Sequence, residues 1–285
     1  MVDIRFAPPQ DREEVVQFMQ TAFPRAKWGM SRWQALLSGR WGAPDDPFAL
    51  VVRDKGALVG VLGLVTANRQ TASGTYKTAN MTSWYVQKPY RGQGIGGRML
   101  EVVTADSQTT ITNFSSAKGA VPVVERAGFS VLDAERCVWQ PSGVNGPLRV
   151  EAEPLTLGGD ISARDRQVVE DHVGLNVKPV AVETPDGWCV IVLAVKQKTD
   201  AYVTHEVMYL GDRALFGAHA RAIANSILPP ERAVLSVDRR FVKDGVAPDA
   251  VEAFDVPRYY TAGRMPAADV ENLYSEIPLL DLKMY

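Results

Sequence analysis

The residues best suited to bind a ligand form a basic, glycine-rich turn. In chain order they are Arg91, Gly92, Gln93, Gly94, Ile95, Gly96 and Gly97. A helix is expected to begin within this turn, so backbone N–H groups lack partners at the end where the helix dipole concentrates positive charge. Such a turn binds phosphate. The phosphate loop of nucleotide hydrolases requires Lys followed by Ser or Thr, and dinucleotide-binding turns follow GxGxxG. Neither pattern describes this turn.

The turn instead follows (Gln/Arg)xxGx(Gly/Ala), which resembles motif A of the GCN5-related N-acetyltransferases (GNAT). A strand ending at Val86 precedes it, an amphipathic helix follows it, and Gly128-Phe129 stands where the family places its Gly-Phe pair. The resemblance implies that acetyl-CoA (coenzyme A) binds here through its pyrophosphate. The implied cofactor-binding residues are Tyr85, Val86, Arg91, Gly92, Gln93, Gly94, Ile95, Gly96, Gly97, Ser115 and Ser116. The alternative is a glycine-rich connection without a ligand.

N-acyl transfer needs a proton acceptor for the amine, donors for the oxyanion and an acid for the thiolate. In the family, a backbone N–H near the end of the strand before the turn faces the thioester carbonyl, which implies Tyr85 or Val86. Relatives that modify histones carry Glu at the position of Asn80. An amide cannot act as a base, but Asn80 can orient a water molecule, with Ser83 on the same strand. The catalytic candidates are therefore Asn80, Ser83 and Tyr85, and a residue of the second half is the other source of a base.

The acid that many relatives use is absent. Counting back from Gly128, their Tyr position is Val124 and their Asn position is Ala117. This departure implies slower or differently assisted turnover, and it leaves open a CoA-binding sensor or scaffold without turnover.

The amine acceptor is expected near the region between the first two helices. Trp28, Trp33 and Trp41 lie there among arginines, a combination that can stack on a sugar or nucleotide ring and hold its phosphates. The alternative is that Trp33 belongs to the helix core. In the second half, His205 is a candidate for acceptor binding or a structural histidine.

Composition limits the classes of function. The 285 residues carry a net charge of −2 with both signs interspersed, so we expect no nucleic-acid partner. The longest apolar runs have strand length and residues 1–6 do not resemble a signal peptide, so we expect a cytoplasmic protein without a membrane span. Cys137 and Cys189 fall on strands of different halves, so neither a disulfide nor a metal site is expected. A homodimer is left open.

The expected elements of the first half alternate between helices and strands. Periodicity and turn residues predict the order β, α, α, β, β, β, α, β, α, β. The ranges are 2–6, 11–22, 31–37, 48–52, 58–66, 76–86, 94–106, 110–114, 118–126 and 129–139. This order is the one expected of the GNAT fold, an α/β (α+β) architecture with a mixed twisted sheet flanked by helices. The resemblance implies that the strands on either side of the turn's helix splay apart.

The second half resembles a repeat of the first. After a turn-rich linker at 141–147, residues 148–285 give a strand, a helix near 163–173, strands at 188–196 and 201–210, a helix at 214–227 and a strand at 233–237. Gly211-Asp212-Arg213 lacks the phosphate-binding pattern and places a carboxylate where a phosphate would lie. We therefore expect a GNAT domain at 1–140 and a degenerate GNAT-like copy without a CoA loop at 148–285. The alternative is an unrelated α+β domain.

These observations predict an N-acetyltransferase that moves an acetyl or short acyl group from CoA to a primary amine of a small molecule by direct attack. An amino sugar is the favoured acceptor. Besides the silent CoA-binding protein, an N-acyltransferase that uses acyl carrier protein or longer acyl donors stays open.

Overall fold

A computed structural model describes residues 2–26, 28–71, 73–143, 147–197 and 202–282. They form two compact units. The first comprises Met1–Leu132, Val256–Val270 and Tyr274–Met284, and the second comprises Asp133–Asp255 with Glu271–Leu273. The change of unit lies between Leu132 and Asp133. Residues 144–146 of the expected linker fall outside the described residues, and a division into domains at 140 and 148 stays a prediction.

The first unit contains six strands. They are β1 (Asp3–Phe6), β2 (Ala49–Asp54), β3 (Ala57–Thr71), β4 (Gly74–Val86), β5 (Thr109–Asn113) and the end of β12 (Ala250–Tyr260). Their spatial order is β1-β2-β3-β4-β5-β12, and only β4 and β5 run parallel. A parallel pair needs a helical crossover, and the helix that follows the glycine turn provides it.

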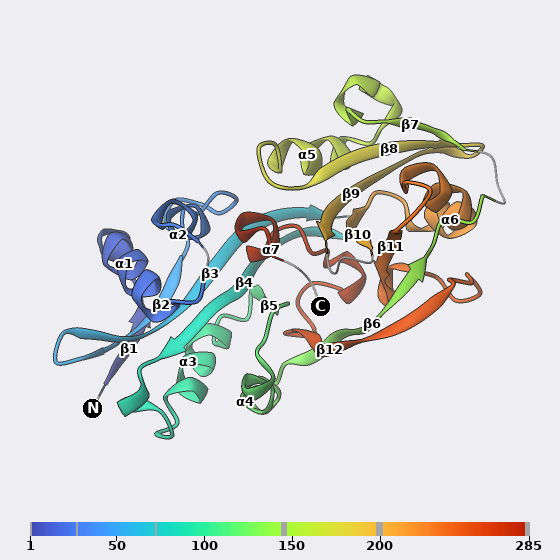
Figure 1. Ribbon diagram of the computed structural model, residues 1–285. Coiled ribbons are helices and arrows are strands. Elements are labelled where there is room, and N and C mark those ends of the chain that lie inside the picture. Colours follow the sequence, from blue (N-terminus) through green and yellow to red (C-terminus); the bar gives the residue numbers. More distant parts are fainter. Residues whose placement is uncertain (1, 27, 72, 144–146, 198–201, 283–285) are drawn as a thin grey trace. The chain divides into compact units, whose positions relative to one another are not determined.

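Helices cover both faces of this sheet. α1 (Arg12–Ala22) and α2 (Met30–Leu36) lie on one face, and α3 (Ile95–Thr104) and α4 (Val121–Arg126) lie on the other (Figure 1). α3 buries Ile95, Met99, Leu100 and Val103, one stripe at helical spacing, in a core that also contains Leu62 and Met81. The predicted order of elements in this half is confirmed through β6 (Ser130–Trp139).

The second unit repeats this order. Its elements are β7 (Arg149–Glu151), α5 (Ala163–Asp171), β8 (Lys178–Thr184), β9 (Gly187–Gln197), β10 (Val203–Leu210), α6 (Arg213–Ile227) and β11 (Ala233–Asp238). The strands lie in the order β7-β8-β9-β10-β11-β6, and only β10 and β11 run parallel. The recurrence of order and direction is what a tandem arrangement predicts. β8 was not predicted, because Pro179 interrupts a run that otherwise reads as a strand.

The sixth strand of each unit comes from a distant part of the chain. β6 follows α4 directly, yet it pairs antiparallel with β11 in the second unit, with Trp139 opposite Leu235. β12 comes late in the chain and pairs antiparallel with β5 in the first unit, with Tyr259 opposite Asn113. The sequence did not predict the strand β12. Pro257 suggested a break, but the pairing with β5 involves only Tyr259 and Tyr260, so the missing N–H of Pro257 costs no bond there.

The segment after β12 returns to the first unit. Arg264 donates to the backbone oxygens of Thr104, at 2.9 Å, and of Thr109. Arg69 on β3 donates to the backbone oxygen of Asp269 at 3.0 Å. The segment then forms α7 (Glu276–Leu280), whose first turn is capped by the hydroxyl of Ser275. This short helix, which contains a proline, was not predicted.

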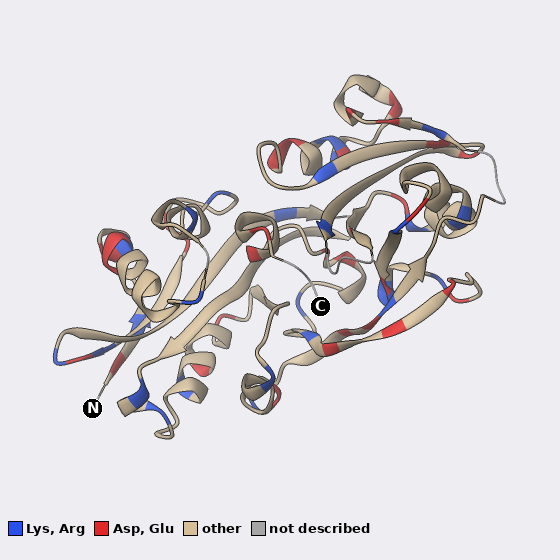
Figure 2. Ribbon diagram, viewed as in Figure 1, with Lys and Arg blue, Asp and Glu red and all other residues tan. Residues whose placement is uncertain are grey.

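Short 3-10 turns complete the structure. They are η1 (Pro9–Asp11), η2 (Lys88–Tyr90), η3 (Lys118–Ala120), η4 (Pro154–Asp160), η5 (Arg239–Phe241) and η6 (Ala267–Asp269). Basic and acidic residues are interspersed along the elements of both units (Figure 2). Within the described ranges, no helix combines the length and the apolar character that crossing a membrane requires.

Candidate active site

The glycine turn adopts a conformation that L side chains rarely take. Gly92 and Gly94 have φ values of 77° and 73°, in the left-handed region that favours glycine. Gly94 is the N-cap of α3, and because it has no side chain, no side-chain oxygen satisfies the first N–H groups of the helix from this position. A Cβ on Gly92, Gly94 or Gly97 would meet no atom within 4 Å. The turn therefore leaves open space in front of a helix N-terminus, as a phosphate requires.

A groove of about 990 Å³ adjoins this turn. The end of β4, the turn, the start of α3 and residues of α4 line it. The structure brings eight of the predicted cofactor-binding residues together there: Tyr85, Val86, Arg91, Gly92, Gly94, Ile95, Gly96 and Gly97. Gln93 does not line the groove, and its amide donates to the backbone oxygen of Pro89 at 2.9 Å.

Two arginines bring positive charge to the groove. Arg91 is held by a hydrogen bond from its Nε to the backbone oxygen of Val86 at 2.7 Å, and its guanidinium lies 5.2 Å from the ring centre of Tyr85. Arg126 on α4 lines the other wall, and Glu101 on α3 adds one negative charge. The groove can thus bind a large anion in its glycine-rich part.

The floor of the groove is a tight contact between a glycine and an indole. A Cβ on Gly96 would lie 2.9 Å from Cζ2 of Trp84, closer than real Cβ atoms approach such atoms. Gly96 therefore has to be a glycine for α3 to begin this close to β4.

β4 is irregular where it passes the groove. Val61 pairs with Tyr85 and Gly63 pairs with Thr82, so Ser83 and Trp84 both lie opposite Leu62 in a β-bulge. Ser83 has φ 50°, an uncommon conformation for a residue with a side chain.

β4 and β5 pair only as far as Asn80 and Thr112, although β4 continues to Val86. The two parallel strands therefore separate before β4 ends, as the resemblance implied.

A second cavity, of about 340 Å³, adjoins the groove at this separation. Trp84 and Ala120 line both spaces. Its apolar walls come from Phe23, Trp28, Leu62, Met81, Leu280 and Leu282, and its polar groups come from Thr82, Ser83, Asn113, Ser115 and Ser116. None of the described residues that line it carries a charge. Ser115 and Ser116, predicted to touch the cofactor, thus line this cavity and not the groove.

A buried carboxyl group that sequence reasoning missed lies behind this cavity. Glu276 on α7 is 0% exposed, and its Oε1 accepts a hydrogen bond from the Oγ of Ser115 at 2.6 Å. Its Oε2 is buried without a hydrogen-bond partner. Burial raises the pKa of Glu276 to about 7, while the bond from Ser115, a backbone N–H and the charge of Arg258 act in the opposite direction. A carboxyl group with this pKa exchanges its proton near neutral pH.

Asn80 holds the start of α7. Its Oδ1 accepts from the backbone N–H of Glu276 at 3.3 Å, and its Nδ2 donates to Oγ1 of Thr112 at 3.1 Å. Asn80 is fully buried and does not line either space of the first unit. The structure gives it a supporting place beneath Glu276, and its predicted role in orienting a water molecule stays a prediction. Ser83 and Tyr85, the other catalytic candidates, line the cavity and the groove.

The predicted acceptor residues lie in different surroundings. Trp28 lines the cavity, and Trp33 is 1% exposed, packed against Trp28 and Phe23 with ring centres 5.2 and 5.6 Å apart. Trp33 thus has the place that the core interpretation gave it. Trp41 is buried against the ring of Tyr274.

Two further positions named from the sequence are buried. His205 lies on β10 in the second unit, where burial, followed by the charge of Lys178, lowers its pKa. Val124, at the family's Tyr position, lies in the core of the first unit.

The equivalent helix start in the second unit is closed by carboxylates. Asp212 caps α6 by accepting from the backbone N–H of Leu215 at 2.8 Å. A Cβ on Gly211 would collide with Oδ1 of Asp165, whose carboxylate also accepts from the hydroxyl of Tyr209 at 2.7 Å. Negative charge and bulk therefore occupy the place where a phosphate would bind.

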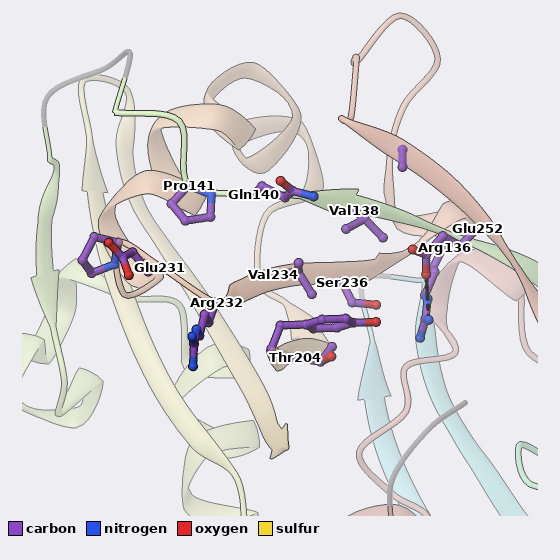
Figure 3. A pocket seen from close by; sticks show the side chains of 14 residues that line it. Arg136, Val138, Gln140, Pro141, Thr204, Glu231, Arg232, Val234, Ser236 and Glu252 are labelled. Atoms are coloured by element: carbon purple, nitrogen blue, oxygen red, sulfur yellow. Dashed lines mark hydrogen bonds and ion pairs between the residues drawn. The ribbon is translucent and has the colours of Figure 1, made fainter. Parts of the chain in front are cut away.

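A third pocket, of about 340 Å³, lies within the second unit between β6, β10 and β11 (Figure 3). Arg136 points toward Glu252 in this view, and their charged groups are 2.7 Å apart. Glu206 lies 3.5 Å from the same guanidinium. The arginines that line this pocket, Arg136 and Arg232, are matched by the carboxylates of Glu231 and Glu252, so its described lining has no excess positive charge. No group of three His, Cys, Asp or Glu side chains within the described ranges is placed to hold a metal ion.

Comparison with known proteins agrees with this geometry. Residues 12–129 match the model of the Acetyltransferase (GNAT) family. A GCN5-related N-acetyltransferase from Anabaena variabilis ATCC 29413 is similar in structure, with a TM-score of 0.57 and 10% identity over 91% of this chain and 72% of that one. A probable N-acyltransferase from Enterococcus faecalis V583 gives 0.54 and 12% over the same shares. A GCN5-related N-acetyltransferase from Kribbella flavida gives 0.52 and 12% over 91% and 70%. No curated protein sequence matches the chain.

Proposed function

We propose, on the premise that residues 12–129 form an acetyltransferase domain of the GNAT family, that this acyltransferase moves an acetyl or short acyl group from CoA to a primary amine of a small molecule by direct attack. The observation that carries the proposal is the junction of two spaces at the separation of β4 and β5. One space ends in an anion-binding turn, and the other is a smaller, mostly apolar cavity.

The residues that line the groove would bind the cofactor, and those beside the cavity would act on the reacting groups. The N–H groups at Gly94 and the start of α3, with Arg91 and Arg126, would hold the pyrophosphate of acetyl-CoA. Acetyl-CoA supplies an acyl group as a reactive thioester. The bulge at Ser83 and Trp84 interrupts the β3–β4 ladder beside the cavity, so polar groups of β4 are available where an oxyanion would form.

The cavity indicates an acceptor with an apolar body. Phe23, Trp28 and Met81 offer apolar surface, and the described lining residues carry none of the charges that the phosphates of a nucleotide-linked sugar would need. Arg32, one of the arginines that favoured an amino sugar, donates instead to the backbone oxygen of Leu280 at 3.0 Å. We therefore favour a small amine with an aromatic or aliphatic body over an amino sugar.

The same apolar cavity supports a second candidate function. A longer acyl chain on the donor would fill it, as expected of an N-acyltransferase that uses long acyl donors. Comparing acetyl-CoA with hexanoyl-CoA and octanoyl-CoA separates the two. A kcat/KM at least tenfold higher for acetyl-CoA supports an acceptor in the cavity, and a preference for octanoyl-CoA supports the acyl chain.

Two measurements on the purified protein test the proposed function. CoA should raise the Tm, and acetyl-CoA with a panel of alkyl, arylalkyl and sugar amines should release free thiol. Stabilisation by CoA without thiol release from any amine would favour the silent CoA-binding protein. Absence of both effects would overturn the assignment of the groove.

A further inference from the structure

We propose that Ser115 and Glu276 form the proton-accepting pair of the transfer: Ser115 contacts the amine in the cavity, and Glu276 takes the proton through the hydroxyl of Ser115. This inference rests on the proposed function. It assigns Ser115 as the catalytic residue and Glu276 as a positioning residue that stores the proton.

The pair connects the open cavity to a fully buried group. Ser115 is exposed and lines the cavity, and its hydroxyl is directed by the 2.6 Å bond to Oε1 of Glu276. Because the hydroxyl donates to the carboxylate, its oxygen lone pairs are available to accept a hydrogen bond from an ammonium group. Oε2 of Glu276 remains buried without a partner, an expensive arrangement for a carboxyl group that serves only packing.

The surroundings of Glu276 keep its position fixed. Its backbone N–H binds Asn80 on β4, and Asn80 in turn binds Thr112 on β5. α2 contacts α7, and Arg32 of α2 binds the backbone oxygen of Leu280 at the far end of that helix. The backbone of α7 is therefore held by β4 at its start and by α2 at its end. Some relatives carry a glutamate at the position of Asn80. In this chain Asn80 instead holds Glu276, which supplies the carboxylate that this position lacks.

The surroundings of Glu276 place the pKa of its carboxyl group near neutral pH. Burial raises its pKa to about 7, and among the described charged groups that act on it, Arg258 on β12 lowers the pKa. Asn80 and Ser115 face it with neutral groups. A carboxylate in this state accepts a proton from an ammonium group more readily than an exposed carboxylate does.

The proton balance is complete. The ammonium group gives one proton to Oγ of Ser115 while the hydroxyl proton of Ser115 passes to Glu276, which leaves a neutral amine and a neutral carboxylic acid. The amine nitrogen then forms the C–N bond, the C–S bond breaks, and the second nitrogen proton goes to the departing sulfur. Glu276 returns its proton to solvent through Ser115.

The test compares Glu276→Gln, Ser115→Ala and Ser115→Thr with the wild type. With an alkylamine at pH 8, Glu276→Gln and Ser115→Ala should each lose about 100-fold in kcat/KM. Ser115→Thr keeps the hydroxyl and should recover most of the loss. An arylamine is already neutral at this pH, so Glu276→Gln should lose about tenfold or less with it. Asp45→Asn removes an exposed carboxylate of the same unit that lines neither space and serves as the control.

A readout without substrate follows the proton directly. The infrared difference between wild type and Glu276→Gln, recorded without CoA from pH 5 to 9, should show a carboxylic acid band that disappears around pH 7. If the wild type acylates an alkylamine and Glu276→Gln does so equally well, the proposed roles of Ser115 and Glu276 are wrong and the proposed function stands. If no amine is acylated by the wild type, the proposed function fails. The pair then fails as well if the infrared band disappears near pH 4 to 5.

Discussion

Glu276 should make the stability of the first unit depend on pH in a way that one substitution removes. The folded protein binds a proton at this carboxyl group with a pKa of about 7, against an ordinary value of 4.5. Its contribution to stability is therefore fully present below about pH 4.5 and is lost as the pH rises through 7. Glu276→Gln keeps the size of the side chain and cannot ionise.

The size of the effect follows from the burial of the group. One pH unit between the folded and unfolded pKa values corresponds to about 1.4 kcal/mol, so the values 7 and 4.5 correspond to about 3 kcal/mol. No reduction for solvent screening applies, because the side chain is 0% exposed. The free energy of unfolding of the wild type should thus fall by about 3 kcal/mol relative to the variant between pH 4.5 and pH 7.5.

Urea unfolding curves of both proteins at half-unit steps across this range measure the difference. All other carboxyl groups are common to the two proteins, so their titration cancels. The control Asp45→Asn, at an exposed position, should not reproduce this difference. A constant difference between wild type and Glu276→Gln from pH 4.5 to 7.5 would mean that Glu276 ionises like an exposed carboxyl group, which would refute the reasoning from burial.

Three further changes test other parts of the structure. Gly94→Glu should abolish the rise in Tm that CoA causes, because it places negative charge in the phosphate site. Gly94→Ala carries the same backbone strain without the charge and should retain part of that rise. Ser83→Gly should raise the free energy of unfolding by about 1 kcal/mol by removing a left-handed conformation from a residue with a side chain, and an unchanged urea midpoint would count against strain at the bulge. Asp212→Ala should cost about 1 kcal/mol through loss of the α6 cap while CoA affinity, measured by calorimetry, stays the same. A tenfold change in that affinity would mean that the second unit influences the groove.

The elements of the first half were predictable because their causes are local. Turn residues and apolar spacing marked each strand and helix from β1 to β6, and the glycine turn carried its own pattern. The strand β3 runs to Thr71, beyond the predicted end at 66, because its partner β4 already begins at Gly74. Local patterns failed where a proline stands inside a strand, as in β8 and β12.

The residues proposed to accept the proton could not be predicted from local sequence patterns. Asn80 and Glu276 meet across 196 positions of sequence, and only the fold brings them together. Locally, the sequence shows only that Glu276 stands directly before an apolar run, Ile277-Pro278-Leu279-Leu280. The pairing of β6 with β11 was equally hidden, because the alternation of a strand does not specify its neighbour.

The late arrival of β12 has a consequence for synthesis of the chain on the ribosome. When β5 emerges, the first unit has an open sheet edge, and this edge stays unpaired until Tyr259 and Tyr260 are made. At 5 to 20 residues per second, the roughly 150 residues between them take roughly 7 to 30 seconds. An open edge during that time can pair with another nascent chain. The carboxyl group of Glu276 arrives later still, so the anion-binding turn exists on the ribosome before the group that would accept the amine's proton.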